Sequence, residues 1–192
     1  LNLNFILKRH LKNIKESENY NIWHFIFLNY KSLLIIDALY EIDKNIIVTF
    51  QGADIQINKK INYGNRLNKK YDKLLKTVIP KIKFFTAISN NIHNDLLKIG
   101  IKNNKIFVIP NGVPLEKFIK LRKKFHNKKN KTLELITVAR YAEKKKGFDL
   151  IPKLVKNLNK INIDFKWTLI GKNTEQIFKN KIINLNKNKF RV

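Results

Sequence analysis

The sequence predicts an α/β fold built from parallel sheets. Short runs rich in β-branched and aromatic residues recur along the chain, and segments with helical periodicity lie between them. Strands that alternate with helices in this way form parallel sheets joined by right-handed crossovers. Several of the strand-like runs end at a glycine or a polar residue, as expected where a parallel sheet presents its carboxyl ends to a ligand. The chain has 192 residues, which is enough for more than one such sheet.

The first part of the chain predicts four strands and four helices. The strands are expected at 22–27, 45–50, 83–88 and 105–109, and the helices at 1–18, 31–42, 67–78 and 90–99. The run at 22–27 is mostly apolar and is expected to be buried. Ser89 is expected to cap the fourth helix and Gly100 to end it. The apolar side chains expected to face inward from the second helix are those of Leu33, Leu34, Ile36, Ala38 and Leu39.

The second part begins with an alternating apolar run at 133–138, which predicts a strand. A loop with three consecutive lysines and Gly147 leads from this run into a helix expected at 148–158. A further strand is expected at 165–170 and a further helix at 174–183. The polar segment LRKKFHNKKNK at 121–131 is interpreted as part of a linker. The predicted organisation is an N-terminal domain at 1–118, a linker at 119–131 and the start of a C-terminal domain at 132–192.

Residues at the strand ends are the candidate ligand contacts. Arg140 and Lys146 lie in the basic loop, where two cations and a helix N-terminus favour a phosphate; a merely solvated loop is the alternative in a chain so rich in lysine. Asp54 either accepts hydrogen bonds from its own loop or contacts a substrate hydroxyl, and the sequence leaves both open. The candidates at the strand exits other than the basic loop are Gln51, Gly52, Asp54, Ser89, Asn111, Gly112 and Gly171.

The composition limits the function classes. The formal net charge is +26, but Lys, Asn and Ile are spread over predicted strands, helices and loops alike. Nucleic-acid binders concentrate charge on one face and carry recognisable motifs, so no nucleic-acid partner is expected, whereas attraction to an anionic membrane or substrate is plausible. With no Cys and four scattered His, no metal site is expected. No run is long enough to cross a bilayer, and the N-terminus shows no signal peptide. Because the chain contains no Met, we expect it to be a fragment.

Four segments, in order, carry a resemblance to a known family. They are TFQGADI at 49–55, FFTAISNNIHNDLLKIGIKNNKIFVIPNGVPLEKF at 84–118, ITVARYAEKKKGFDLIPKL at 136–154 and WTLIGKN at 167–173. These segments resemble the retaining glycosyltransferases of family 4, whose GT-B fold has two Rossmann-like domains. The PNG turn at 110–112 and the later Arg140…Lys-Gly element, found together at this separation, are specific features of the resemblance to this family.

The resemblance implies transfer of a hexosyl group from a nucleotide-sugar to a sugar or lipid-linked acceptor, with retention, in the synthesis of cell-surface polysaccharide or glycolipid. It implies that Arg140 and Lys146 bind the donor diphosphate, with Lys145 as the rival to Lys146 because the loop is one residue longer than the usual pattern. It implies no cofactor beyond the nucleotide-sugar substrate, and no metal. The expected location is cytoplasmic, with peripheral contact to the inner face of an anionic membrane.

The sequence also departs from the family pattern. Gln51 stands where the family commonly has a His, and Gln cannot carry its positive charge. His24 resembles another histidine of the family, although a strand histidine is more often a packing residue. The glycine-rich loop after the first strand and the acidic E-x7-E element that contacts the donor are absent, so no catalytic residue is identified and the fragment alone is expected to be inactive.

Two other functions remain as alternatives. The first is a different Rossmann-like enzyme of sugar-nucleotide chemistry, such as an epimerase, which would need a carboxylate cluster in the cleft. The second is a basic non-enzymatic module that binds nucleic acid or an anionic membrane, for which affinity would fall steeply with salt.

Overall fold

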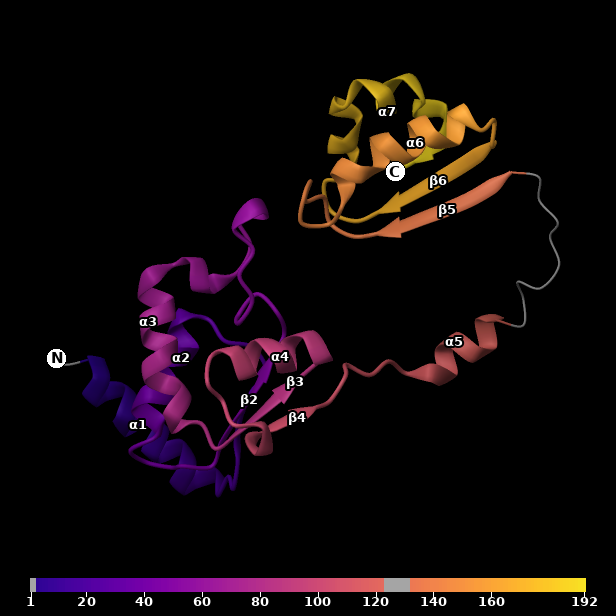
Figure 1. Ribbon diagram of the computed structural model, residues 1–192. Helices are drawn as coiled ribbons and strands as arrows, with labels where there is room; N and C mark the ends of the chain where they lie inside the picture. The colour runs from indigo at the N-terminus through magenta and orange to yellow at the C-terminus, as the bar shows by residue number, and fades with distance from the viewer. Residues whose placement is uncertain (1–2, 123–131) are drawn as a thin grey trace. The chain divides into compact units, whose positions relative to one another are not determined.

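In the computed structural model, residues 3–122 and 132–192 are described, and the chain divides into two compact units between Val113 and Pro114. Each unit contains one parallel sheet with helices packed on it (Figure 1). The expected α/β fold with parallel sheets is confirmed. Of the predicted linker, residues 123–131 lie outside the described residues, and 119–122 belong to helix α5 (Leu115–Arg122).

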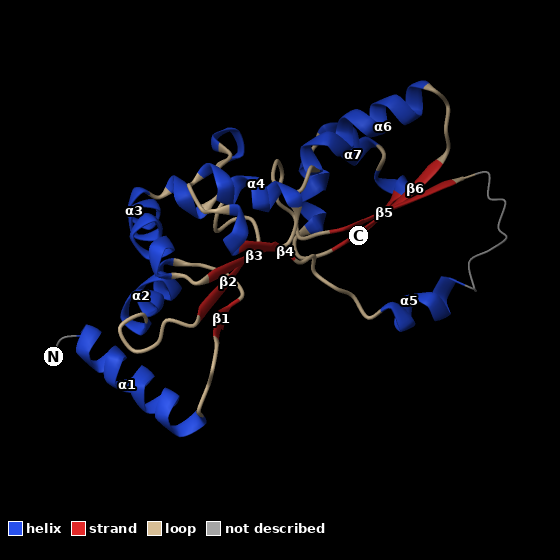
Figure 2. Ribbon diagram, turned by 60° about the horizontal axis from the view of Figure 1, so that its bottom comes forward, coloured by secondary structure: helices blue, strands red, loops and turns tan. Residues whose placement is uncertain are grey.

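The first unit has a four-stranded sheet in the order β1-β2-β3-β4, so each strand pairs with the one that precedes it in the sequence. The strands are β1 (Trp23–Phe25), β2 (Ile46–Phe50), β3 (Phe84–Ala87) and β4 (Ile106–Val108). The helices are α1 (Leu3–Glu18), α2 (Tyr30–Leu39), α3 (Lys69–Val78) and α4 (Asn90–Lys98). Figure 2 shows α2 and α3 beside the strands of this sheet.

The core of the first unit lies on one face of its sheet. Alternation along β2 buries Ile46, Val48 and Phe50 completely, and the ring of Phe50 stacks on that of Phe85 with centroids 6.3 Å apart. The other buried apolar side chains come from the helices packed on this face and from the connecting segments, and include Leu33, Ile36, Leu39, Leu75, Val78, Ile92 and Leu96. This core between the sheet and its helices holds the strands in place, and with them the loops that follow the strands.

The second unit has a three-stranded parallel sheet in the order β5-β6-β7. Its strands are β5 (Leu133–Val138), β6 (Phe165–Ile170) and β7 (Phe190–Arg191), and its helices are α6 (Ile151–Lys160) and α7 (Lys181–Leu185). Phe165, Trp167 and Leu169 alternate along β6 into a core that includes Phe148, Ile151 and Val155. The strands at 133–138 and 165–170 agree with the sequence prediction in both bounds.

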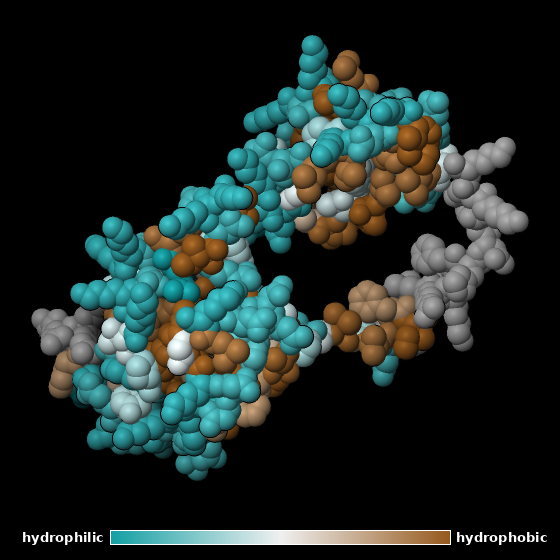
Figure 3. Space-filling model, in the orientation of Figure 1, coloured by the Kyte–Doolittle hydropathy of each residue, from teal (hydrophilic) through white to brown (hydrophobic). Residues whose placement is uncertain are grey.

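Each sheet also has an exposed face with apolar side chains. In the second unit this face includes Ile136, Val138 and Ile170, of which Val138 is 72% exposed. In the first unit Phe107 of β4 is exposed, and it points to the face opposite to that of the buried Ile106. Figure 3 shows apolar surface along the β5 side of the second unit and over α5.

Several sequence predictions were wrong in detail. The run at 22–27 forms a strand only at Trp23–Phe25, and Ile26 and Phe27 are 63% and 41% exposed, because the chain leaves this edge strand before they are reached. Leu34 is 42% exposed, because the buried stripe of α2 follows a helical period that Leu34 does not share.

The helix predicted at 148–158 starts as a 3₁₀ turn, η5 (Phe148–Leu150), and continues as α6. The helix predicted at 174–183 is instead η6 (Thr174–Lys179) followed by α7, because the extended backbone of Asn180 ends one helix while its side chain caps the next. Strand β7 was not predicted.

Candidate functional site

The loop after β2 is closed around the carboxylate of Asp54. This side chain is fully buried, and its oxygens accept hydrogen bonds from the backbone N–H groups of Gln51 (3.1 Å), Gly52 (2.8 Å) and Leu28 (3.3 Å). Burial raises the pKa of Asp54, and these backbone donors partly offset the rise. The sequence left open whether Asp54 binds its own loop or a substrate hydroxyl. The structure shows the first: the carboxylate holds its own loop and connects it to the segment after β1.

A second set of bonds joins the same two strand exits to the start of α3. Tyr71 is buried, and its hydroxyl lies 2.9 Å from the carbonyl oxygen of Asp54. The side-chain amide of Asn65 donates to the carbonyl of Leu28 (3.1 Å), and its backbone N–H donates to the carbonyl of Ala53 (2.6 Å). Burial and the charge of Asp54 raise the pKa of Tyr71, so the hydroxyl keeps its proton and acts as a donor. The strand exits of this unit are therefore held by a satisfied polar network.

Two predicted cleft residues from distant parts of the chain meet in this unit. The side-chain amide of Asn111 donates to the side-chain oxygen of Gln51 (3.1 Å), which links the loop after β2 to the turn after β4. Ser89 caps α4 as predicted, and its hydroxyl accepts from the N–H of Ile92 (3.4 Å). A Cβ on Gly112 would meet nothing within 4 Å, so the fold itself does not require glycine there.

A chain of polar side chains crosses the sheet from β1 to β3. His24 Nε2 lies 2.7 Å from the hydroxyl of Thr49, which in turn hydrogen-bonds the hydroxyl of Thr86. His24 is exposed, so it is not the core packing residue that a strand histidine more often is. The sequence prediction did not include the two threonines.

In the second unit, Gly171 brings the exit of β6 against that of β5. Its φ is +151°, and a Cβ built on it would lie 2.2 Å from the carbonyl oxygen of Ala139 and 2.9 Å from the backbone nitrogen of Arg140. No side chain fits that space without a shift of the backbone. Parallel pairing continues past the strands through bonds from the N–H of Ala139 to the carbonyl of Ile170 (2.9 Å) and from Tyr141 to Lys172 (2.8 Å).

The loop beyond this contact gathers three cations. Burial lowers the pKa of Lys145, and the positive charges of Arg140 and Lys146 lower it further. Within the described residues, neither Arg140 nor Lys146 forms an ion pair. Gly147 follows with φ +73° and turns the chain into η5. The sequence-predicted phosphate loop thus carries an excess of positive charge, with Glu143 as its one carboxylate between Arg140 and Gly147.

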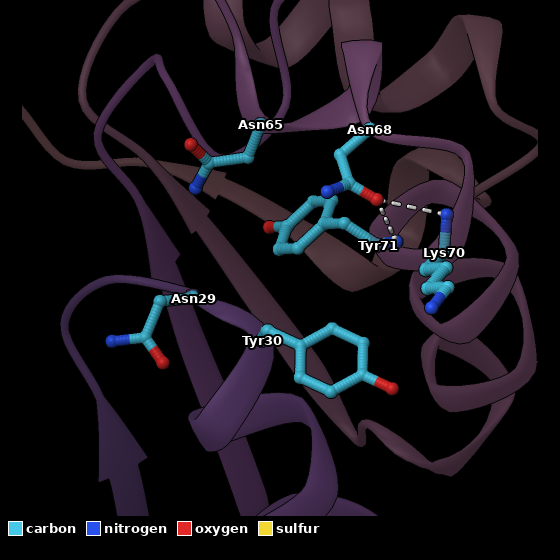
Figure 4. Close-up of a pocket in the computed structure, with 6 residues that line it drawn as sticks. All are labelled: Asn29, Tyr30, Asn65, Asn68, Lys70 and Tyr71. Atoms are coloured by element: carbon cyan, nitrogen blue, oxygen red, sulfur yellow. Dashed lines mark hydrogen bonds between the residues drawn. The ribbon is translucent and has the colours of Figure 1, made fainter.

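A pocket that sequence reasoning did not predict lies in the first unit near the N-termini of α2 and α3 (Figure 4). It has a volume of about 430 Å³. The residues that line it are Asn29, Tyr30, Asn65, Asn68, Lys70 and Tyr71. Asn residues at predicted helix starts could have indicated the pocket. Asn is so common throughout this chain, however, that its presence at these positions does not distinguish them.

Two further searches bear on the chemistry of the site. Within residues 3–122 and 132–192, no three His, Cys, Asp or Glu side chains are arranged to hold a metal ion. Among the helices that the structure describes, none combines the length and apolar character needed to cross a membrane.

Comparison with known proteins gives a family and a fold. Residues 1–117 match the model of Glycosyltransferase Family 4. A comparison with curated proteins found no match. The chain is similar in structure to UDP-N-acetylglucosamine 2-epimerase from Rickettsia bellii (12% identity, TM-score 0.53, 98% of this chain and 49% of that one). It is also similar to UDP-GlcNAc 2-epimerase from Neisseria meningitidis bound to UDP-GlcNAc (15%, 0.51, 98% and 52%) and to a chain of the GtfA/B complex (12%, 0.55, 96% and 36%).

At these identities the structural similarity establishes the fold alone. The chain spans about half the length of the epimerases it resembles. The expected fold class, with two Rossmann-like parallel-sheet domains of the GT-B type, is confirmed.

Proposed function

Because the chain belongs to glycosyltransferase family 4, we propose that it is part of an enzyme that transfers a hexosyl group from a nucleotide-sugar to an acceptor with retention. The bond between the sugar C1 and the diphosphate oxygen breaks, and its electrons leave with the nucleoside diphosphate. The acceptor hydroxyl forms the new bond to C1 and loses its proton. The observation that supports this proposal most strongly is that Arg140, Lys145 and Lys146 lie in one loop, between the end of β5 and η5, at the exit that Gly171 holds against the end of β6.

These three cations suit the departure of a nucleoside diphosphate. Negative charge grows on the diphosphate as the bond to C1 breaks, so fixed cations stabilise the transition state more than the ground state. The guanidinium of Arg140 can bind two phosphate oxygens at once, whereas a lysine acts as a point charge. Burial and, to a smaller extent, the charges of Arg140 and Lys146 lower the pKa of Lys145, and an anion bound beside these groups would favour their charged forms. No metal is needed for this charge balance.

The exit loops of the first unit are proposed to contact the acceptor. Gln51 and Asn111 present side-chain amides that already meet each other, and amides can donate to or accept from a sugar hydroxyl. The backbone at Gly112 is open, so a ligand can approach it closely. Ser89, Gly52 and Asp54 shape the loops, and Asp54 does so through its buried carboxylate.

The acceptor class and location are also proposals. A sugar or a lipid-linked acceptor of cell-surface polysaccharide or glycolipid fits the family and the net charge of +26, which would draw the protein to the anionic inner face of a membrane from the cytoplasm. The same charge would favour nucleic acid, but no nucleic-acid motif accompanies it.

Donor binding tests the proposal most directly. In the full-length protein, Arg140→Ala, Lys145→Gln and Lys146→Gln are titrated with pyrophosphate, UDP, GDP and ADP and compared with Lys144→Gln. Lys144 lies in the same loop and its change removes the same charge, which makes it the matched control. We expect Arg140→Ala to weaken nucleotide binding about 100-fold and the more important of the two lysines about tenfold. Equal losses in all four variants would mean that the loop attracts anions only through its overall charge.

The product distinguishes the transferase from the alternative enzyme. Incubation with a bound nucleotide-sugar and a panel of sugar acceptors should give a new glycosidic bond and free nucleoside diphosphate. A nucleotide-sugar that changes its configuration at C2 without transfer would instead establish epimerase chemistry. Binding of nucleic acid that falls steeply with salt, without nucleotide binding, would favour the basic module.

A further inference from the structure

The pocket at the N-termini of α2 and α3 has the chemistry of a sugar site. Its volume of about 430 Å³ lies within the usual range for small-molecule sites. It opens beyond the carboxyl end of the first sheet, because Asn29 follows the segment after β1 and Asn65 hydrogen-bonds that same segment. Ligands of parallel sheets bind at this end.

The three asparagines of the pocket are held in fixed orientations. The side-chain oxygens of Asn29 and Asn68 accept from the backbone N–H groups of Ser32 (3.0 Å) and Lys70 (2.9 Å), which leaves their NH₂ groups as donors. In Asn65 the NH₂ group is the one engaged, since it donates to the carbonyl of Leu28, and the side-chain oxygen remains as an acceptor for a ligand. A ligand with several hydroxyls could use both kinds of group at little cost in side-chain ordering.

One of the two tyrosines that line the pocket, Tyr30, supplies an apolar surface beside these amides. The ring of Tyr71 is buried, with its hydroxyl turned to the carbonyl of Asp54, while Tyr30 is 47% exposed. Figure 4 shows both rings beside the pocket, together with the amides and Lys70. The exposed ring of Tyr30 next to fixed amides matches a pyranose ring, which has an apolar C–H surface and a rim of hydroxyls.

The charge of the pocket is positive. Lys70 forms no ion pair within the described part of the chain, and no Asp or Glu lines the pocket. The N-termini of two ten-residue helices add to this potential. Lys70 is exposed, so its ammonium stays hydrated beside a neutral sugar, but it attracts an anionic group on a ligand that reaches the rim of the pocket.

We propose that this pocket binds a sugar that carries a carboxylate or a phosphate, with Lys70 at the anionic group, Tyr30 against the ring and the three asparagines at the hydroxyls. As an acceptor site, the pocket rests on the proposed transferase function and narrows the acceptor to an acidic sugar.

The test is binding of three monosaccharides to the full-length protein, followed by calorimetry or NMR titration: glucuronic acid, glucose 6-phosphate and glucose. We expect at least one acidic sugar to bind about tenfold or more tightly than glucose. Preference for glucuronic acid identifies a uronic acid, and preference for glucose 6-phosphate identifies a phosphorylated sugar. Equal binding of all three, binding of none, or binding of inorganic phosphate as tight as that of the sugar phosphate would overturn the proposal.

Two variants and one matched control assign the residues. Lys70→Gln should weaken binding of the acidic sugar about tenfold and leave glucose unaffected, and Tyr30→Ala should weaken both. Lys73→Gln removes the same charge from the same helix outside the pocket and should change neither; an equal effect of both lysines contradicts the site. Nucleotide binding in the Arg140 variants tests the transferase proposal separately, so that either idea can fail while the other stands.

Discussion

The two units treat the polar groups at their strand ends in opposite ways. In the first unit a buried carboxylate, that of Asp54, is surrounded by backbone donors, and a buried tyrosine and an asparagine complete the network. In the second unit Arg140, Lys145 and Lys146 lie at the exit of β5, and burial together with the two neighbouring charges lowers the pKa of Lys145. A network that satisfies itself gives rigidity, whereas a cluster of like charges gains stability when an anion joins it. The exit loops of the first unit therefore form a rigid frame, and the exit loop of the second unit is the one that we propose to bind an anion.

The chain offers a separate probe for each unit, because it contains two tryptophans, Trp23 in the first and Trp167 in the second. The variants Trp167→Phe and Trp23→Phe leave one tryptophan each, so that urea unfolding followed by fluorescence reports one unit at a time. These two backgrounds serve for all the stability measurements below.

The largest effect is expected for Asp54→Ala in the first unit. Three backbone N–H groups lose their acceptor in a buried place, which should lower the free energy of unfolding by about 4 kcal/mol. The transition seen by Trp23 should shift strongly and that seen by Trp167 should not. Asp54→Asn, which keeps one acceptor oxygen, should cost less. A small effect of Asp54→Ala would mean that the loop does not depend on this carboxylate.

In the second unit the comparable position is a glycine. Gly171→Ala places a Cβ 2.2 Å from the carbonyl oxygen of Ala139 at a φ of +151°, so we expect a loss of about 3 kcal/mol in the transition reported by Trp167. Because Arg140 is next to the displaced carbonyl, binding of UDP should weaken as well. Unchanged stability together with unchanged UDP binding would show that the two strand exits are not held against each other by this contact.

The fold was largely predictable because both sheets are parallel and their strands follow one another in sequence order. Short apolar runs between helical segments leave few other arrangements. Two elements were predicted wrongly because hydrophobic periodicity does not reveal them. Strand β7 has only two residues, and the extended backbone of Asn180 divides a segment that the sequence predicted as one helix. The exposure of Ile26 depends on where the edge strand ends, which periodicity does not specify.

The candidate site was predictable in part for the same reason. Glycines and charges after strands indicated both exit loops, but a sequence does not say whether a carboxylate faces its own backbone or a ligand, and Asp54 required the structure. The pocket with Tyr30 and Lys70 was missed because it is built by Asn side chains from separate segments, which only tertiary packing brings together.

A smaller effect is expected for Asp43, whose carboxylate joins α1 to the loop after α2. Burial alone would raise the pKa of Asp43, but the N–H of Asn45 and the ammonium of Lys15 (3.1 Å) outweigh it and hold the pKa below its ordinary value. The carboxylate therefore stabilises the first unit above about pH 4, and this contribution is lost as the pH falls through the lowered pKa.

The variant Asp43→Asn measures that contribution. At pH 7 it should lower the free energy of unfolding reported by Trp23 by about 1 kcal/mol, and the difference from the unchanged chain should shrink toward zero in more acidic solution. The transition reported by Trp167 provides the control, because Asp43 lies in the other unit. A difference that stays constant with pH would show that the carboxylate is not the titrating group.

The smallest effect on stability, and the sharpest test of the frame, is expected for Gly112→Ala. A Cβ at this position meets nothing within 4 Å and φ lies outside the left-handed region, so the free energy of unfolding should change by less than about 0.5 kcal/mol. Gly100→Ala, at a φ of +89° with equally open space, should cost about 1 kcal/mol and serves as the control. If Gly112→Ala leaves stability unchanged but reduces sugar transfer about tenfold, glycine is needed there for a ligand that approaches the backbone. If transfer is also unchanged, the turn after β4 contributes to the first unit only as a connection, and the contact between Asn111 and Gln51 remains the part of that turn to test.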